Sequence, residues 1–185
     1  MNMKKKILTD IAICFALILS VIAAGGIYYF VLTEEITLDG MPAPDIEEQI
    51  EIYKEMDFCK GGHLTEDNED IVIYLTRYQR NKWLEFVKED MKNMLESANA
   101  LENMEYHVSE DREELILLAR RNVSFNSVGI YGMILTYDIE LYQILSGEKD
   151  WGFKFILKDM DTDEILYTAD VPEEKVRVYD YLWDK

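Results

Sequence analysis

Residues 71–108 read IVIYLTRYQRNKWLEFVKEDMKNMLESANALENMEYHV, and this segment shows the clearest succession of secondary structure in the chain. Its first six residues, 71–76, are mostly β-branched, aliphatic or aromatic, which predicts a strand. Over residues 78–101 apolar side chains recur at spacings of three and four, which predicts a helix. Over residues 104–108 apolar and polar side chains alternate, which predicts a second strand.

The chain beyond this segment continues in the same manner. Residues 115–121 predict a third strand, and residues 127–145 predict a helix that is apolar over most of its circumference. Residues 151–157 and 164–171 predict a hairpin. The order strand, helix, strand, strand, helix, strand, with one further strand, is that of the split βαβ (ferredoxin-like) plan. We therefore expect an α+β domain over residues 71–185, with two helices on one face of an antiparallel sheet.

Residues 33–70 predict less regular structure before this domain. Residues 33–44 contain one glycine and two prolines and resemble a connector. Asp45 is placed to cap a short helix that ends near Met56, and an irregular acidic segment follows. We expect residues 33–70 to form a stem that carries the larger domain.

The N-terminal part predicts a membrane anchor. Three lysines at residues 4–6 precede an apolar run over residues 11–32. At about 1.5 Å per residue this run would reach roughly 33 Å, which is enough to cross a hydrocarbon core about 30 Å thick. Lysines beside a span favour the cytoplasmic side. We therefore expect residues 1–32 to be a cytoplasmic end and a single-pass signal-anchor in the lipid bilayer of the cell membrane, with residues 33–185 outside the cytoplasm.

A cleaved signal peptide is the alternative interpretation of the same segment. Ala23, Ala24 and Gly25 supply small residues at a site where a signal peptidase would cut. Cleavage there would leave the apolar residues 27–32 near a new N-terminus, and the run is longer than an ordinary signal-peptide core. In this alternative the protein is secreted rather than anchored.

The charge of the chain limits its partners. The sequence has 37 acidic and 19 basic residues, a net charge of −18. Proteins bind nucleic acid through an excess of lysine and arginine, so the composition argues against a nucleic-acid partner. Aromatic residues make up 12% of the chain, which is too many for a disordered acidic tail. We expect a folded module on a short stem, and the acidic charge favours attraction to cations or to a basic partner.

The sequence contains no motif of a common enzyme class. It has no G-x-G-x-x-G, no phosphate-binding G-x-x-x-x-G-K, no G-x-S-x-G and no H-E-x-x-H pattern. It also has only two histidines, His63 and His107, which leaves little material for a catalytic triad or a zinc site. We expect a protein that is not an enzyme and that holds no cofactor.

The turn of the predicted hairpin offers an alternative metal site. Asp159, Asp161 and Asp163 have the alternating spacing that begins an EF-hand loop, and Asp170 falls at its twelfth position. Glu164 stands where that loop needs glycine, and strands flank the turn where the motif requires helices. Calcium is therefore the alternative cofactor, and an ordinary solvated turn is the default.

The basic residues predict a second site, for an anion. In a split βαβ sheet the first and third strands are parallel neighbours, so basic residues that follow them would meet at one edge. Both predicted helices would begin at that edge, where their free N–H groups favour anions. The alternative is that these cations only pair with neighbouring acids. The residues of this predicted anion site are Arg77, Arg80, Lys82, Arg120, Arg121, Ser124 and Ser127, with Asn126 as a further donor.

These observations lead to one functional hypothesis and two alternatives. The first is a non-enzymatic binding or adaptor module, anchored in a membrane, for a protein or an anionic envelope ligand. The second is a structural subunit that assembles, as a homo-oligomer for example, through the unpaired edges of its sheet. The third is an enzyme that uses carboxylates with a divalent metal.

Overall fold

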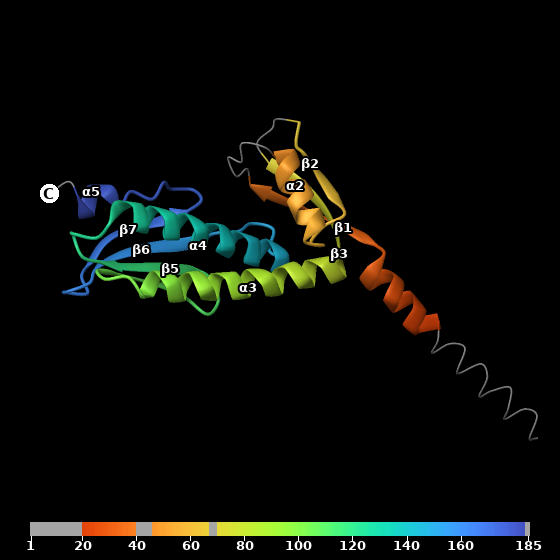
Figure 1. The fold of residues 1–185 in the computed structure, drawn as a ribbon, viewed down its shortest axis with the longest axis horizontal. Helices are drawn as coiled ribbons and strands as arrows, with labels where there is room; N and C mark the ends of the chain where they lie inside the picture. The colour runs from red at the N-terminus through yellow and green to blue at the C-terminus, as the bar shows by residue number, and fades with distance from the viewer. Residues whose placement is uncertain (1–19, 40–45, 67–69, 184–185) are drawn as a thin grey trace, which may run out of the picture. The chain divides into compact units, whose positions relative to one another are not determined.

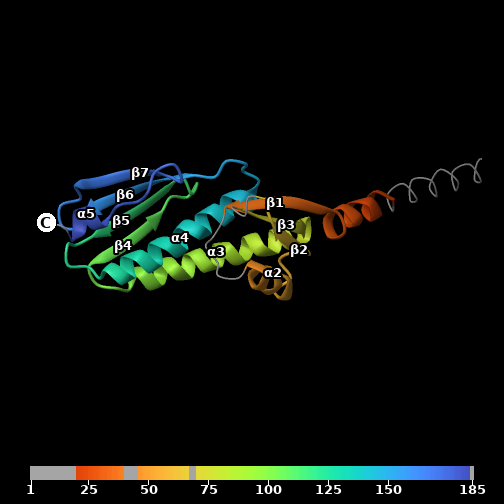
Figure 2. The same cartoon turned by 90° about the horizontal axis from the view of Figure 1, so that it is seen from above.

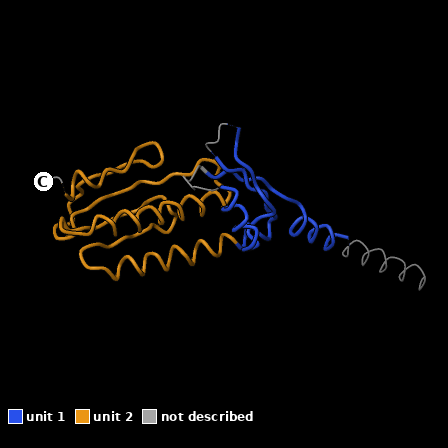
Figure 3. The backbone as a smooth tube through the Cα atoms, turned by 45° about the horizontal axis from the view of Figure 1, so that its top comes forward, with its two compact units in different colours: residues 1–82 blue, residues 83–185 orange. Residues whose placement is uncertain are grey.

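The computed structural model describes residues 20–39, 46–66 and 70–183, and Figure 1 shows the path of the chain through them. The chain divides into two compact units, residues 1–82 and residues 83–185, which Figure 3 shows in different colours. The division falls inside helix α3 (Arg77–Asn99). Each unit contains its own β-sheet.

The first unit is built around a three-stranded antiparallel sheet with the strand order β1-β3-β2. Ile36 and Leu38 of β1 are buried and pair with residues 73 and 71 of β3. This alternation of buried and exposed residues is what a strand with one covered face requires. The elements of the unit before α3 are a helix over residues 20–30, β1 (Thr33–Asp39), α2 (Ile46–Glu55), β2 (Gly61–Leu64) and β3 (Asp70–Thr76).

A capping box joins β3 directly to α3. The side-chain oxygen of Thr76 accepts the backbone N–H of Gln79, and the side-chain oxygen of Gln79 accepts the backbone N–H of Thr76. The amide nitrogen of Gln79 donates to Asp57 and to the carbonyl of Cys59. The bond from Gln79 is the main reason why the pKa of Asp57 lies below its usual value. The start of α3 is therefore tied to the loop that follows α2.

The second unit has a four-stranded sheet with the strand order β4-β5-β6-β7. Strands β5 and β6 are parallel, and helix α4 lies between them in the sequence, whereas the two outer pairs are antiparallel. After α3, the elements are β4 (Met104–Val108), β5 (Glu114–Ala119), α4 (Phe125–Ser146), β6 (Phe153–Asp159), β7 (Ile165–Val171) and α5 (Tyr179–Leu182).

One face of this sheet carries the core of the second unit. Tyr106 lies opposite Leu117, and Leu115 lies opposite Phe155, and all four side chains are buried on the same face. Helices α3 and α4 both pack on that face (Figure 2). Leu182 of α5 joins the same core, so α5 also lies on the side of the helices.

The predicted arrangement of the strands was wrong, although most of the predicted elements are present. The strand at residues 71–76 was expected in one sheet with the strand at residues 115–121, but β3 and β5 belong to different sheets. Strand β3 pairs instead with β1 and β2, which come from the segment that was interpreted as a stem. Once both edges of β3 are filled in this way, no single split βαβ sheet forms. The fold class is α+β with two sheets.

The predicted transmembrane helix was also wrong. In the described part of the chain, no helix has both the length and the apolar character needed to cross a membrane. Within the predicted span, the structure describes a helix over residues 20–30, whose length is only about 16 Å at 1.5 Å per residue. The chain then enters β1 at Thr33. Residues 11–19 of the predicted span lie outside the described residues. The expected bilayer contact and the placement of residues 33–185 outside the cytoplasm lose their basis with this helix.

Candidate functional site

The first half of the predicted anion site lies in the first unit, and most of its charges have partners. The guanidinium of Arg80 lies 2.9 Å from the carboxylate of Glu34. The ammonium of Lys82 lies 3.3 Å from the carboxylate of Asp57. The guanidinium of Arg77 lies over the ring of Tyr28, 5.5 Å from its centroid.

The second half lies in the second unit. The guanidinium of Arg120 lies 2.9 Å from Asp161 and also donates to the side chain of Asn103. Ser124 caps α4 by accepting the backbone N–H of Ser127. The two halves were expected to meet because their strands would be neighbours, and that pairing is absent. Anion binding at these residues stays a prediction, without the strand pairing on which it was based.

The predicted calcium turn is held by its own hydrogen bonds and ion pairs. The carboxylate of Asp159 accepts the backbone N–H groups of Asp161 and Thr162, and these bonds lower its pKa. Asp163 pairs with Lys158 at 3.1 Å. Among the described residues, no group of three or more His, Cys, Asp and Glu side chains is arranged to hold a metal ion. Calcium binding stays a prediction.

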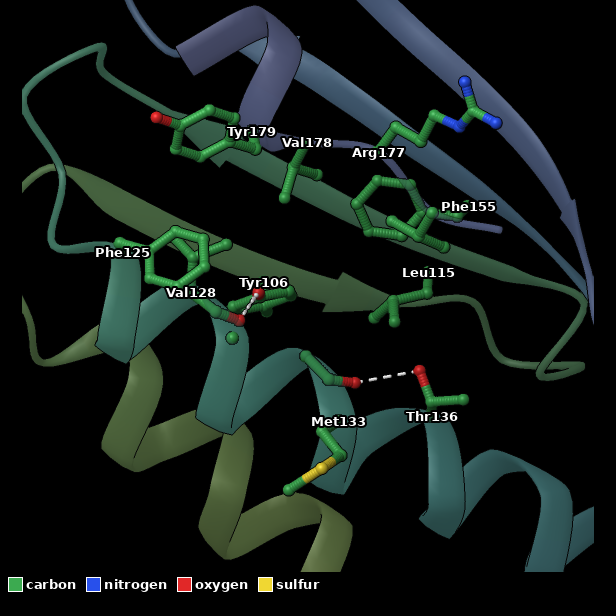
Figure 4. A pocket seen from close by; sticks show the side chains of 13 residues that line it. Tyr106, Leu115, Phe125, Val128, Met133, Thr136, Phe155, Arg177, Val178 and Tyr179 are labelled. Carbon is green, nitrogen blue, oxygen red and sulfur yellow. Dashed lines mark hydrogen bonds between the residues drawn. The ribbon is translucent and has the colours of Figure 1, made fainter. Parts of the chain in front are cut away.

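The strongest candidate site is an apolar groove of about 440 Å³ in the second unit (Figure 4). Its floor is the core face of the sheet, at Tyr106, Leu115 and Phe155. One wall is the part of α4 between residues 128 and 136, and the other is formed by residues 176–179. The lining is mainly carbon, and the volume lies in the range of roughly 300–1,000 Å³ that small-molecule sites occupy.

Two glycines on α4 make the groove wide. Gly129 and Gly132 are three residues apart and therefore lie on the same side of the helix. At Gly132 packing favours glycine, since an added Cβ would lie 3.0 Å from the hydroxyl oxygen of Tyr106, which would have to shift slightly. At Gly129 an added Cβ would meet no described heavy atom within 4 Å. Glycine inside a helix costs about 1 kcal/mol relative to alanine, and packing gives no reason for that cost at Gly129.

Replacing Gly129 with alanine should raise the free energy of unfolding by about 1 kcal/mol, because the helix gains propensity and the methyl group enters open space. Urea denaturation would measure the change. Gly132→Ala is the matched control, since it raises the helix propensity equally but crowds Tyr106. Its free energy of unfolding should therefore rise less. A loss of stability in Gly129→Ala would show that packing does require glycine there.

Two hydroxyl groups in the groove, those of Tyr106 and Thr136, already have hydrogen-bond partners. The hydroxyl of Tyr106 donates to the carbonyl of Val128 at 2.8 Å, and that of Thr136 donates to the carbonyl of Gly132 at 2.8 Å. Burial raises the pKa of Tyr106, so its phenol stays protonated at neutral pH. These groups are poorly suited to acid–base chemistry, and the interior is better suited to holding carbon.

The far wall of the groove belongs to a segment that we call the C-terminal strap, residues 172–178. The hydroxyl of Tyr167 on β7 donates to the carbonyl of Lys175 in the strap. Beyond the strap, the indole N–H of Trp183 donates to the carbonyl of Val123, just before α4. The strap is therefore fixed at its middle and beyond its end, and the groove is formed before any ligand arrives.

The mouth of the groove exposes large apolar side chains. The exposed fractions are 54% for Phe125, 68% for Met133, 41% for Val176 and 48% for Tyr179. The rings of Phe125 and Tyr179 meet edge to face, with centroids 5.9 Å apart. Clustered apolar exposure of this kind is typical of a binding surface, whereas single exposed apolar residues are ordinary.

No sequence pattern predicted this groove as a site, although one signal was present. Gly129 and Gly132 lie within the predicted helix over residues 127–145. Glycines weaken a helix, so two of them on one side of it indicate a packing or functional reason for their presence. The sequence of the strap contains no comparable signal, because the position of the strap depends on the path of the chain after β7. Comparison of the chain with protein-family models, curated proteins and solved structures found no match.

Proposed function

We propose that the second unit is a non-catalytic binding module that receives an elongated apolar group in the groove beside α4. Gly129 carries this proposal, because it keeps the groove open at a cost in helix stability that packing does not explain. The exposed apolar mouth and the fixed strap agree with it. Assembly of the chain into a homo-oligomer or a larger structure stays a prediction.

A series of straight-chain alcohols from hexanol to decanol tests this function with the full chain. Burial of one methylene stabilises a complex by about 0.8 kcal/mol, so affinity should rise about fourfold for each added carbon until the groove is full. Isothermal titration calorimetry would measure the affinities. An affinity that does not depend on chain length would contradict a groove that takes up apolar chains.

A matched pair of variants locates the binding. Gly129→Leu places a branched side chain in the open space and should weaken decanol binding about tenfold or more, the equivalent of expelling roughly two methylenes. Gly129→Ala makes the same helix more stable and leaves the groove nearly as wide, so it should bind like the native protein. Equal binding by the two variants would place the alcohol elsewhere and overturn the proposal.

A further inference from the structure

The apolar groove adjoins a second, polar hollow of about 400 Å³, and Arg177 lines both. The polar hollow is also lined by Lys175 of the strap and Asp180 of α5. In Figure 4 the stem of Arg177 begins beside Phe155, and its guanidinium points away from α4 and out of the groove. A ligand that leaves the groove along this stem would therefore reach a charged group.

Arg177 and Lys175 differ in their ion pairing from most basic residues of the predicted anion site. Arg80 and Arg120 each have a carboxylate at 2.9 Å. In contrast, neither the guanidinium of Arg177 nor the ammonium of Lys175 has an acid of the described residues within ion-pair distance. Other described basic residues, such as Arg121 and Lys154, also have no such partner, so it is the position beside the groove that distinguishes Arg177 and Lys175. Two cations at the rim of an apolar groove have therefore been left available.

The polar hollow is lined by two acids, Glu174 and Asp180, as well as by the two cations. The carboxylate of Glu174 accepts the backbone N–H of Asp170 at 3.1 Å, so it is engaged within the turn. Glu174 keeps its negative charge in this bond, so both Glu174 and Asp180 oppose an anion in the hollow. The acidic surface as a whole also repels anions, but physiological salt screens that repulsion beyond about 8 Å. Binding of an anion at the rim of the groove therefore depends mainly on the charged groups within a few ångströms of it.

We infer that the ligand is a single-chain amphiphile with a carboxylate head, whose tail fills the apolar groove and whose head lies against Arg177, with Lys175 close by. This inference rests on the proposed function, because it assigns the head group of the ligand whose tail the groove receives. A guanidinium matches a carboxylate through two parallel N–H···O bonds. The fully apolar interior suits the alkyl tail, and the outward direction of Arg177 suits a head that remains partly in water.

The test compares decanoate with decanol, which have tails of similar length, by calorimetry on the full chain at about pH 8, where the carboxylate is ionised. Arg177→Gln should weaken decanoate binding about five- to tenfold and should affect decanol binding much less, because decanol carries no charge for Arg177 to pair with. Asp180→Asn should strengthen decanoate binding, because it removes one of the two opposing charges. Lys149→Gln is the charge-matched control on an exposed loop, and it should change neither affinity.

The outcomes separate this inference from the function on which it rests. If neither decanol nor decanoate binds, the groove takes up no alkyl chain, and both the function and the inference fail. If decanol binds and Gly129→Leu abolishes its binding, but Arg177→Gln leaves decanoate affinity unchanged, only the carboxylate head is overturned. If Lys149→Gln weakens decanoate as much as Arg177→Gln does, net charge rather than contact is responsible, and the assignment of Arg177 fails.

Discussion

Asp138→Asn should stabilise the protein by several kcal/mol at about pH 8, and by much less at about pH 5. Asp138 lies on α4 with an exposed fraction of 3%, and one of its carboxylate oxygens has no hydrogen-bond partner among the described residues. Burial, with a smaller contribution from the charge of Asp90, raises its pKa from 3.8 to about 7. Asparagine has nearly the same shape and carries no charge.

The sign of the pH dependence follows from this shift. Because the folded state holds the proton of Asp138 more tightly than the unfolded state, the stability that this proton provides is fully present below about pH 4. It is lost as the pH rises to about 7 and stays lost above that. A shift of this size is worth on the order of 4 kcal/mol, at about 1.4 kcal/mol per pKa unit.

Urea denaturation of both proteins across this pH range would measure the effect as a difference, which removes the contribution of the other acids. Asp90→Asn is the matched control, because it removes only the smaller of the two causes and should give a weaker gain. A difference between Asp138→Asn and the native protein that does not change with pH would contradict the assigned pKa.

Gln143→Met should lower the free energy of unfolding by about 3 kcal/mol. Gln143 has an exposed fraction of 1%, and its amide donates to the carbonyls of Arg112 and Gly152 while accepting the backbone N–H of Gly152. Methionine fills a similar volume but satisfies none of these groups, and each buried backbone group left without a partner costs about 1–3 kcal/mol. Thermal or urea denaturation would give the loss.

Gln49→Met provides the control for this substitution. Gln49 is a half-buried residue of α2 whose side chain forms no hydrogen bond with a described residue, so the change there should stay within about 0.5 kcal/mol. Similar effects at the two positions would mean that the three bonds of Gln143 do not hold α4 to the loops before β5 and β6.

Local sequence patterns predicted most helices and strands correctly, but they did not predict which strands pair with one another. The helices predicted over residues 78–101 and 127–145 are present as α3 and α4, and the predicted C-terminal hairpin is β6 with β7. Their apolar periodicity depends only on near neighbours in the chain. The pairing of β3 with β1 depends on residues more than thirty positions away. The sequence signal for β1 is also weak, because the strand has only two buried apolar residues, Ile36 and Leu38.

The sites show the same division between local and long-range information. The capping function of Ser124 and the hydrogen bonds of Asp159 arise from contacts with residues two or three positions away. The predicted basic edge was based on a particular strand order, and the observed order is different, so anion binding there stays a prediction without that basis. The groove needs α4, three strands and the strap together. Only Gly129 and Gly132 hinted at it in the sequence.

Binding of an apolar chain in the groove beside α4 can be observed through backbone amide resonances recorded while the full chain is titrated with decanol. We expect the largest shifts at Gly129 and Gly132 on one wall and at residues 176–179 on the other. These shifts should disappear in Gly129→Leu. Shifts confined to other parts of the chain, or no shifts at all while decanol remains in solution, would contradict the proposed binding.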